Sequence, residues 1–188
     1  MKYEPLQYNK FYHIYNRGNN GENIFIEDRN YAFFLSLIQN YILPIAEVHA
    51  YCLLKNHIHL LIKTLNFENK ILYKSFSNLF NAYAKAINKA YDRNGSLFQD
   101  RFSRIQIKND EHLKQLILYI HLNPSHHGFT TNFENYNYSS FNAMMSKAKT
   151  LLKRDDVLEL FDDKSNFRYM HYKRQQEIFE KKSELYLE

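Results

Sequence analysis

Two histidines separated by one residue begin the mostly apolar segment HIHLLIKT at His57. In a β-strand, alternate side chains lie on one face, so the rings of His57 and His59 would project together. Two imidazoles at that spacing can hold one divalent ion. A chain of 188 residues with nine histidines contains such a triplet by chance about 0.4 times. The alternative is therefore a pair of structural histidines whose ring nitrogens have protein partners.

A tyrosine and an asparagine four residues apart form a second candidate group. In a helix, Tyr119 and Asn123 share one face. A phenol can act as a covalent nucleophile, and an amide oxygen is a hard ligand suited to Mg²⁺ or Mn²⁺. Each residue also has a structural alternative when taken singly. Tyr119 would then be a core aromatic, one of 16 tyrosines, and Asn123, which precedes Pro124, would mark the end of a helix. The complete set favours metal-assisted attack by the tyrosine.

The hydrophobic periodicity predicts the elements that position these residues. The expected order is strand 10–17, helix 28–43, strand 45–54, strand 57–64, helix 69–93, strand 102–108, and a helix from Asn109 or Asp110 to about Asn123, ended by Pro124. A two-residue turn, Lys55-Asn56, would join the second and third strands. The order βαββαβ predicts an α+β fold, with a ferredoxin-like antiparallel sheet and helices on one face. The tyrosine-bearing helix follows that sheet.

The last quarter of the chain is charged and amphipathic. Its clearest helical stretches are 155–161 and 166 to about 187, which predict a C-terminal helical appendage. We therefore expect two parts, a main domain of residues 1–141 and a C-terminal helical extension of residues 142–188.

Composition indicates the cellular compartment of the protein and the charge of its partner. A single cysteine, Cys52, excludes an internal disulfide framework and a multi-cysteine metal cluster, and is typical of a reducing compartment. The sequence has neither an apolar signal core nor a membrane-length apolar stretch, so we expect a cytoplasmic protein without a membrane partner. A net charge of +5 and a pI near 9.1 favour a polyanionic partner.

Four ordered segments resemble a known family. They are YHIYNRGNN (12–20), AYCLLKNHIHLLI (50–62), GSLFQDRF (95–102) and LYIHLNP (118–124), and they are similar to the single-tyrosine HUH transposases, most of all to the REP-associated tyrosine transposases. YNYSSF (136–141) and DDVLELF (155–161) extend the resemblance over almost the whole chain. It departs at Lys55, where many relatives have proline, and at Phe98, where they often have tryptophan.

The resemblance implies roles for the two candidate groups. His57, His59 and Asn123 would bind the metal ion, Mg²⁺ or Mn²⁺, and Tyr119 would be the nucleophile. The implied function is that of a DNA transposase, an endonuclease that cleaves and rejoins single-stranded or hairpin DNA through a 5′-phosphotyrosine intermediate. The alternative is a non-catalytic nucleic-acid-binding module that retains the fold. A replication-initiation nuclease of the same chemistry is disfavoured, because the sequence has no helicase segment.

Basic residues near the family segments are candidates for DNA contact. They are Arg17, Lys55, Arg101, Arg104 and Lys108. Phe98 and Phe102 could stack on unpaired bases. The alternatives are solvated surface charges for the basic residues and core packing for the two aromatics. A monomer and a homodimer both stay open, and so does the question of whether the tyrosine helix serves its own histidines or those of a partner.

Overall fold

The fold is built around a four-stranded antiparallel sheet. The computed structural model describes residues 5–99 and 101–185. The first elements are β1 (Phe11–Arg17), η1 (Asn19–Gly21), α1 (Asp28–Tyr41), β2 (Ala46–Leu54), β3 (His57–Thr64), α2 (Asn69–Ala90) and β4 (Ser103–Ile107). The strands lie in the order β2-β3-β1-β4, and every neighbouring pair is antiparallel. The predicted α+β, ferredoxin-like βαββαβ arrangement is therefore confirmed.

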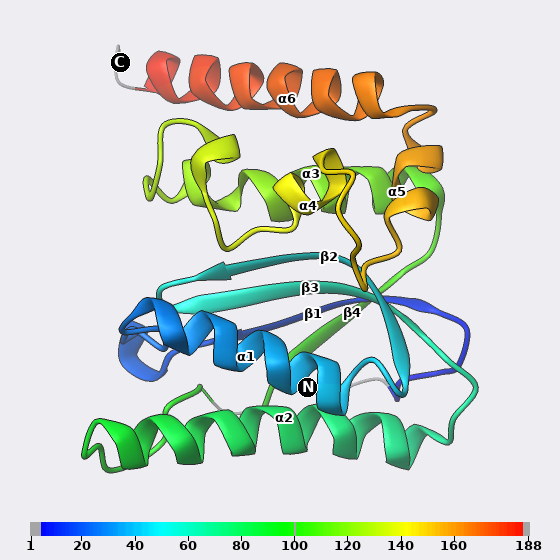
Figure 1. Cartoon of the computed structure of the whole chain (residues 1–188). Coiled ribbons are helices and arrows are strands. Elements are labelled where there is room, and N and C mark those ends of the chain that lie inside the picture. The colour runs from blue at the N-terminus through cyan, green and yellow to red at the C-terminus, as the bar shows by residue number, and fades with distance from the viewer. Residues whose placement is uncertain (1–4, 100, 186–188) are drawn as a thin grey trace.

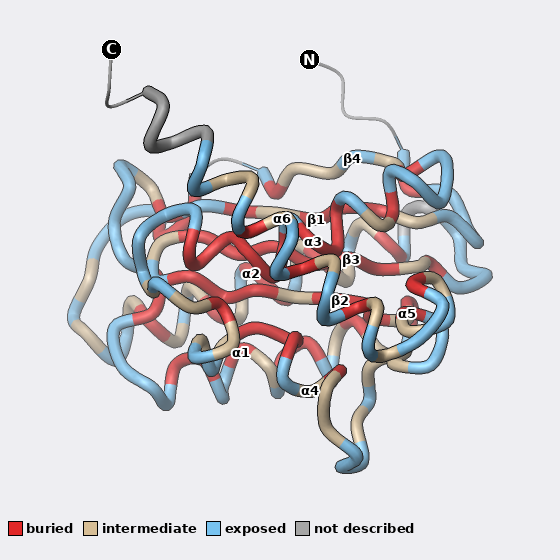
Figure 2. The backbone as a smooth tube through the Cα atoms, turned by 90° about the horizontal axis from the view of Figure 1, so that it is seen from above, coloured by how far each residue is buried: buried red, intermediate tan, exposed pale blue. Residues whose placement is uncertain are grey.

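Helices cover both faces of the sheet (Figure 1). α1 and α2 lie on one face, where they enclose a core that includes Ile14, Leu60 and Ile62. The opposite face carries Leu61 and is covered by α3 (Asp110–His126) and the helices that follow it. Alternation along each strand separates the two cores, because successive side chains point to opposite faces. The red, buried segments of Figure 2 accordingly run through the middle of the molecule.

α3 runs past the proline that was expected to end it. Asn109 is its N-cap and accepts a hydrogen bond from the backbone N–H of His112, as the sequence predicts, but the helix continues through Pro124 to His126. A proline within a helix lacks its own backbone N–H bond, and its ring crowds the carbonyl group four residues earlier. The final turn is held instead by the backbone N–H of His127, which donates to Asn123 O at 3.0 Å.

The C-terminal segment packs on α3. It comprises η2 (Phe133–Asn135), α4 (Phe141–Met145), α5 (Arg154–Leu160) and α6 (Lys164–Leu185). Val157, Phe161 and Phe167 belong to the same hydrophobic cluster as Ile117 of α3. This shared cluster ties α3 to α5 and to α6, the helix that lies above it in Figure 1. The division after residue 141 stays a prediction. None of the described helices is both long and apolar enough to cross a bilayer.

A buried chain of polar side chains joins α3 to α6. The two ring nitrogens of His121 lie 2.7 Å from Ser140 Oγ and 2.9 Å from His171 Nε2, and His171 Nδ1 donates to Phe167 O at 2.7 Å. Both histidines are fully buried. Burial lowers the pKa of His171 to about 4 and that of His121 well below its ordinary value. Both rings are therefore neutral in the folded protein at neutral pH.

We expect the free energy of unfolding to fall as the pH drops from 7 to 4. The unfolded chain protonates its histidines near pH 6.5, whereas the folded chain does so only near pH 4 at His171. Between these values the unfolded state binds more protons, so acid destabilises the fold by up to about 1.4 kcal/mol per pH unit for each such histidine. Urea unfolding at several pH values measures this slope. His171→Gln should show a smaller slope than the wild type, and an equal slope would contradict the assignment.

Candidate functional site

The two histidines of β3 lie on the face that α3 covers. Their ring centroids are 5.1 Å apart, and the residues are 9% and 6% exposed for His57 and His59 respectively. β3 is an inner strand, paired with β1 and β2, so its backbone is held on both sides. Both rings therefore project from the same face of β3, as expected, and both are nearly buried.

α3 brings the tyrosine and the asparagine to these histidines. Asn123 Oδ1 lies 3.2 Å from His57 Nε2. The ring of Tyr119 is edge-on to that of His59, with centroids 5.4 Å apart. Residues 60 or more positions apart in the sequence thus meet because α3 packs across the face of β3 that carries the two histidines. In this single chain, the tyrosine helix lies across its own sheet.

A cavity of about 360 Å³ opens where these side chains meet. Tyr119 is 43% exposed there, so its hydroxyl group can reach a ligand from solvent. The lining residues are Tyr15, Asn16, Arg17, His57, Ile58, His59, Gln99, Arg101, Ser103, Tyr119 and His127. The cavity therefore combines imidazoles, two phenols and two guanidinium groups.

The protonation of the two histidines suits metal binding. Burial lowers the pKa of His57 to about 4 and that of His59 well below its ordinary value, so both rings are neutral at pH 7. His57 Nδ1 lies 2.6 Å from Asn56 Oδ1 and can donate its proton there. The Nε2 lone pair then faces Asn123 Oδ1, an arrangement that needs either a cation or a rotated amide. His59 Nε2 is buried without a hydrogen-bond partner. These donors fit a divalent cation.

A third histidine, which the sequence analysis did not single out, supports the pair. His13 Nε2 of β1 lies 2.8 Å from His59 Nδ1, and burial, followed by the charge of His112, lowers the pKa of His13 to about 4. A hydrogen bond at Nδ1 leaves Nε2 of His59 as the ligand atom. The strand alternation of YHIYNRGNN carried a signal for this residue, but only the β1–β3 register places it beside His59.

The predicted DNA-binding residues divide into two groups. Arg17 and Arg101 line the cavity, and Lys55 is exposed in the turn that precedes His57. Arg104 lies instead over the rings of Tyr73 and Phe102, on the α2 side of the sheet. Lys108 follows the end of β4 that pairs with Phe11, away from the cavity. Strand alternation and strand direction therefore separate the last two residues from the site.

The two candidate stacking aromatics belong to the core. Phe98 and Phe102 are buried in the cluster beneath α2, where both rings contact Phe80. Their faces are therefore unavailable to bases. Core packing, the alternative to base stacking, is therefore correct for both residues.

A close backbone contact holds the turn before His57. The N–H of Gly18 donates to Asn56 O at 2.7 Å, and the N–H of Ile24 donates to Lys55 O at 2.7 Å. A Cβ atom on Gly18 would lie 2.0 Å from Glu22 O. Only glycine allows the loop after β1 to fold this tightly onto the turn.

We expect Gly18→Ala to lower the free energy of unfolding by about 2–3 kcal/mol, because the backbone must move to relieve the contact. Gly21→Ala is the matched control. Gly21 has φ +74° but open space around its Cβ position, so the cost there is about 1 kcal/mol. Denaturant unfolding of both variants measures the difference. Equal losses would show that the contact with Glu22 O is relieved without strain.

Comparisons with known proteins agree with the resemblance of the four segments. No family model matches the chain. A protein of Haemophilus influenzae that is predicted to be a REP-associated tyrosine transposase is 31% identical over 103 residues, which is 50% of this chain. The matched part spans 58% of the length of that relative. The solved structure of a REP-associated tyrosine transposase bound to a REP hairpin superposes with a TM-score of 0.65. It covers 81% of this chain and 93% of that one, at 16% identity. By sequence and by fold, this chain is similar to the REP-associated tyrosine transposases.

Proposed function

We propose that this protein is a DNA transposase, a metal-dependent endonuclease and strand transferase that uses Tyr119 as its nucleophile. One observation carries the proposal. The partly exposed phenol of Tyr119 and the neutral rings of His57 and His59 line one cavity, and Asn123 reaches His57 from the same helix. A non-catalytic binding module has no need of a buried ligand set beside an accessible phenol.

His57, His59 and Asn123 are the residues that would hold the cation, Mg²⁺ or Mn²⁺. When bound, a divalent cation polarises a phosphate and stabilises the charge that develops on it. The imidazole and amide donors are neutral, so a bound cation keeps its full charge for the phosphate. Arg17 and Arg101 add two guanidinium groups to the cavity rim, and such groups bind phosphate oxygens in pairs.

The reaction at Tyr119 is an exchange of one phosphodiester bond for another. The phenolic oxygen forms a bond to phosphorus, and the bond from phosphorus to the 3′ oxygen breaks. The 3′ oxygen leaves as a hydroxyl group with a proton from solvent, and the phenol proton goes to solvent. The product is a 5′-phosphotyrosine link. In the reverse direction a free 3′ hydroxyl attacks that link, which rejoins the strand and releases Tyr119.

The proposed partner is single-stranded or hairpin-forming DNA. The cavity lining includes two cationic side chains, those of Arg17 and Arg101, which suits a flexible phosphate backbone. The structurally similar transposase was solved with a REP hairpin, which favours a hairpin as the first substrate to test. We further propose that the protein acts in the cytoplasm and that residues 1–141 carry the activity. Because α3 already lies over its own sheet, one chain contains a complete set of site residues; a homodimer is not required for cleavage.

Trapping a covalent adduct tests the proposed function. The full chain is incubated with single-stranded and hairpin oligonucleotides and Mg²⁺ or Mn²⁺, denatured, and digested for mass spectrometry. We expect a DNA-linked peptide containing Tyr119, whose trapped DNA can then be sequenced. DNA binding without an adduct, together with no metal binding that depends on His57 and His59, would instead identify a non-catalytic nucleic-acid-binding module.

We expect His13 to act as a positioning residue for His59. His13→Ala removes the hydrogen bond to His59 Nδ1 and should weaken Mn²⁺ binding about 10–100-fold, as does the loss of other partners of metal ligands. His13→Gln keeps an acceptor and should recover part of the affinity. Calorimetric titration measures both variants. A purely packing role for His13 would leave the affinity of the two variants equal.

A further inference from the structure

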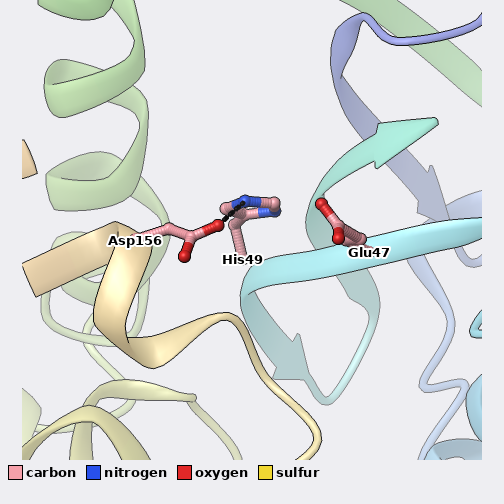
Figure 3. Close-up of side chains that lie close together, drawn as sticks. All are labelled: Glu47, His49 and Asp156. Atoms are coloured by element: carbon pink, nitrogen blue, oxygen red, sulfur yellow. Dashed lines mark ion pairs between the residues drawn. The ribbon is translucent and has the colours of Figure 1, made fainter. Parts of the chain in front are cut away.

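A second cluster of ligand-type side chains lies on the sheet, away from the cavity (Figure 3). It contains Glu47 and His49 of β2 and Asp156 of α5, whose potential ligand atoms all lie within 4.8 Å of one another. Glu47 pairs with Lys63, which is four residues along β3 from His59, or about 13 Å at the usual strand rise. The cluster is therefore separate from the proposed catalytic group.

The state of His49 points to a missing ligand. The residue is 3% exposed, yet neither ring nitrogen has a hydrogen-bond partner. Asp156 Oδ2 lies 3.7 Å from His49 Nε2, beyond hydrogen-bonding distance. Figure 3 shows the ring between the two carboxylates. Buried polar atoms in folded proteins are nearly always paired, so a group that bonds these nitrogens would complete the site.

The backbone explains how the cluster forms. A register shift after Val48 makes His49 the extra residue of a β-bulge, a feature that re-aims side chains beside functional sites. Its ring then packs edge-on against Phe11, with centroids 4.9 Å apart. The backbone N–H of Lys153 donates to Val48 O at 3.0 Å and holds the start of α5 against the strand. Asp156 follows in the first turn of that helix.

We propose that Glu47, His49 and Asp156 bind a divalent transition-metal ion, Zn²⁺ or Mn²⁺, that fastens α5 to β2. One imidazole and two carboxylates form a mixed nitrogen and oxygen donor set, which these ions accept. Asp156 is largely exposed, so water can fill the remaining positions. The ligands come from two elements that meet only in the folded chain, so the ion stabilises the fold. The site does not depend on the proposed cleavage activity.

Lys153 competes with the ion for one ligand. Its Nζ lies 2.6 Å from Glu47 Oε1, and this ammonium group must turn away when the ion binds. Lys153→Met removes the competitor and its repulsive charge. We expect that variant to bind the ion more tightly than the wild type, by about tenfold for each 1.4 kcal/mol of competition removed.

Metal stoichiometry in the full chain tests the proposal. Equilibrium dialysis against Mn²⁺ or Zn²⁺ should give two ions per wild-type chain and one for a His57→Ala/His59→Ala variant. Asp156→Asn and His49→Gln should each remove one ion from the wild type or weaken its binding at least tenfold. Asp155→Asn alters the adjacent exposed carboxylate, which is outside the cluster, and should change nothing.

A thermal measurement supplies an independent readout. Saturating Zn²⁺ should raise the Tm of the His57→Ala/His59→Ala variant, or of the wild type if that variant does not fold, and Asp156→Asn should reduce the rise. Adduct formation on DNA should be unaffected by Asp156→Asn, so failure of the second site is distinguishable from failure of the proposed catalytic site. Equal ion counts, affinities and Tm shifts with and without Asp156 would overturn the proposal, as would the absence, at millimolar Mn²⁺ and Zn²⁺, of any bound ion that depends on Asp156 or His49.

Discussion

Tyr119→Phe is expected to abolish the covalent protein–DNA adduct, to below about one thousandth of the wild-type yield, because it removes the attacking oxygen. The side chain is 43% exposed and its ring packs against His59. The variant keeps that ring, so folding and DNA binding should be nearly unchanged. Adduct yield on a labelled hairpin, DNA affinity and thermal unfolding, measured on the same preparations, separate these effects.

Tyr15→Phe is the matched control for this experiment. Tyr15 lines the same cavity, and its ring lies 6.0 Å from that of His59, so it tests whether any phenol in the cavity suffices. Tyr83 and Tyr91 are poor substitutes for the nucleophile. The Tyr83 hydroxyl donates to Ile24 O from a buried site, and Tyr91 donates to Glu27. An adduct that survives Tyr119→Phe but is lost in Tyr15→Phe would reassign the nucleophile to Tyr15.

Loss of the two proposed metal-ligating histidines is the second change with a large expected effect. His57→Ala and His59→Ala should each reduce adduct formation about 10³-fold, because a bound cation contributes several kcal/mol of charge stabilisation and each 1.36 kcal/mol is a factor of ten. Chelation of the wild type should produce a similar loss. Added Mn²⁺ should restore the chelated wild type but not the variants.

Two controls separate a role for this histidine pair from a general effect of metal ions. His49→Gln and Asp156→Asn alter the other ligand cluster, so they should retain the adduct and serve as controls for general metal effects. In calorimetric titrations with Mn²⁺, the variants at His57 and His59 should lose one binding event. The variants at His49 and Asp156 should keep that event. Cleavage that continues unchanged in both histidine variants would exclude a metal role for the pair, whatever the chelator does.

Local periodicity was sufficient for much of the fold. The strand bounds 57–64 follow directly from the apolar segment between the Lys55-Asn56 turn and Asn66, and they agree with β3. The βαββαβ order likewise followed from alternating periods of two and 3.6 residues. The end of α3 could not be predicted in this way. Pro124 is a stop signal locally, but it is buried with Asn123 in the native packing, which keeps the last turn helical.

The contents of the site depended on contacts between distant segments. Strand alternation in YHIYNRGNN assigns His13 to one face of β1, but only the pairing of β1 with β3 brings its ring to His59. Arg101 lies within the family segment 95–102, and Arg104 and Lys108 follow that segment by only two and six residues. Strand alternation turns Arg104 to the α2 side, and strand direction carries Lys108 to the far end of β4.

The sequence by itself determined which side chains share a face. His57 and His59 lie two apart on a strand, and Tyr119 and Asn123 four apart on a helix, so covalent geometry alone pairs them. Only the tertiary structure decided that these two faces meet within one chain, because that depends on how α3 packs across β3. The same packing buries the histidines and keeps them neutral, a property that no spacing of residues encodes.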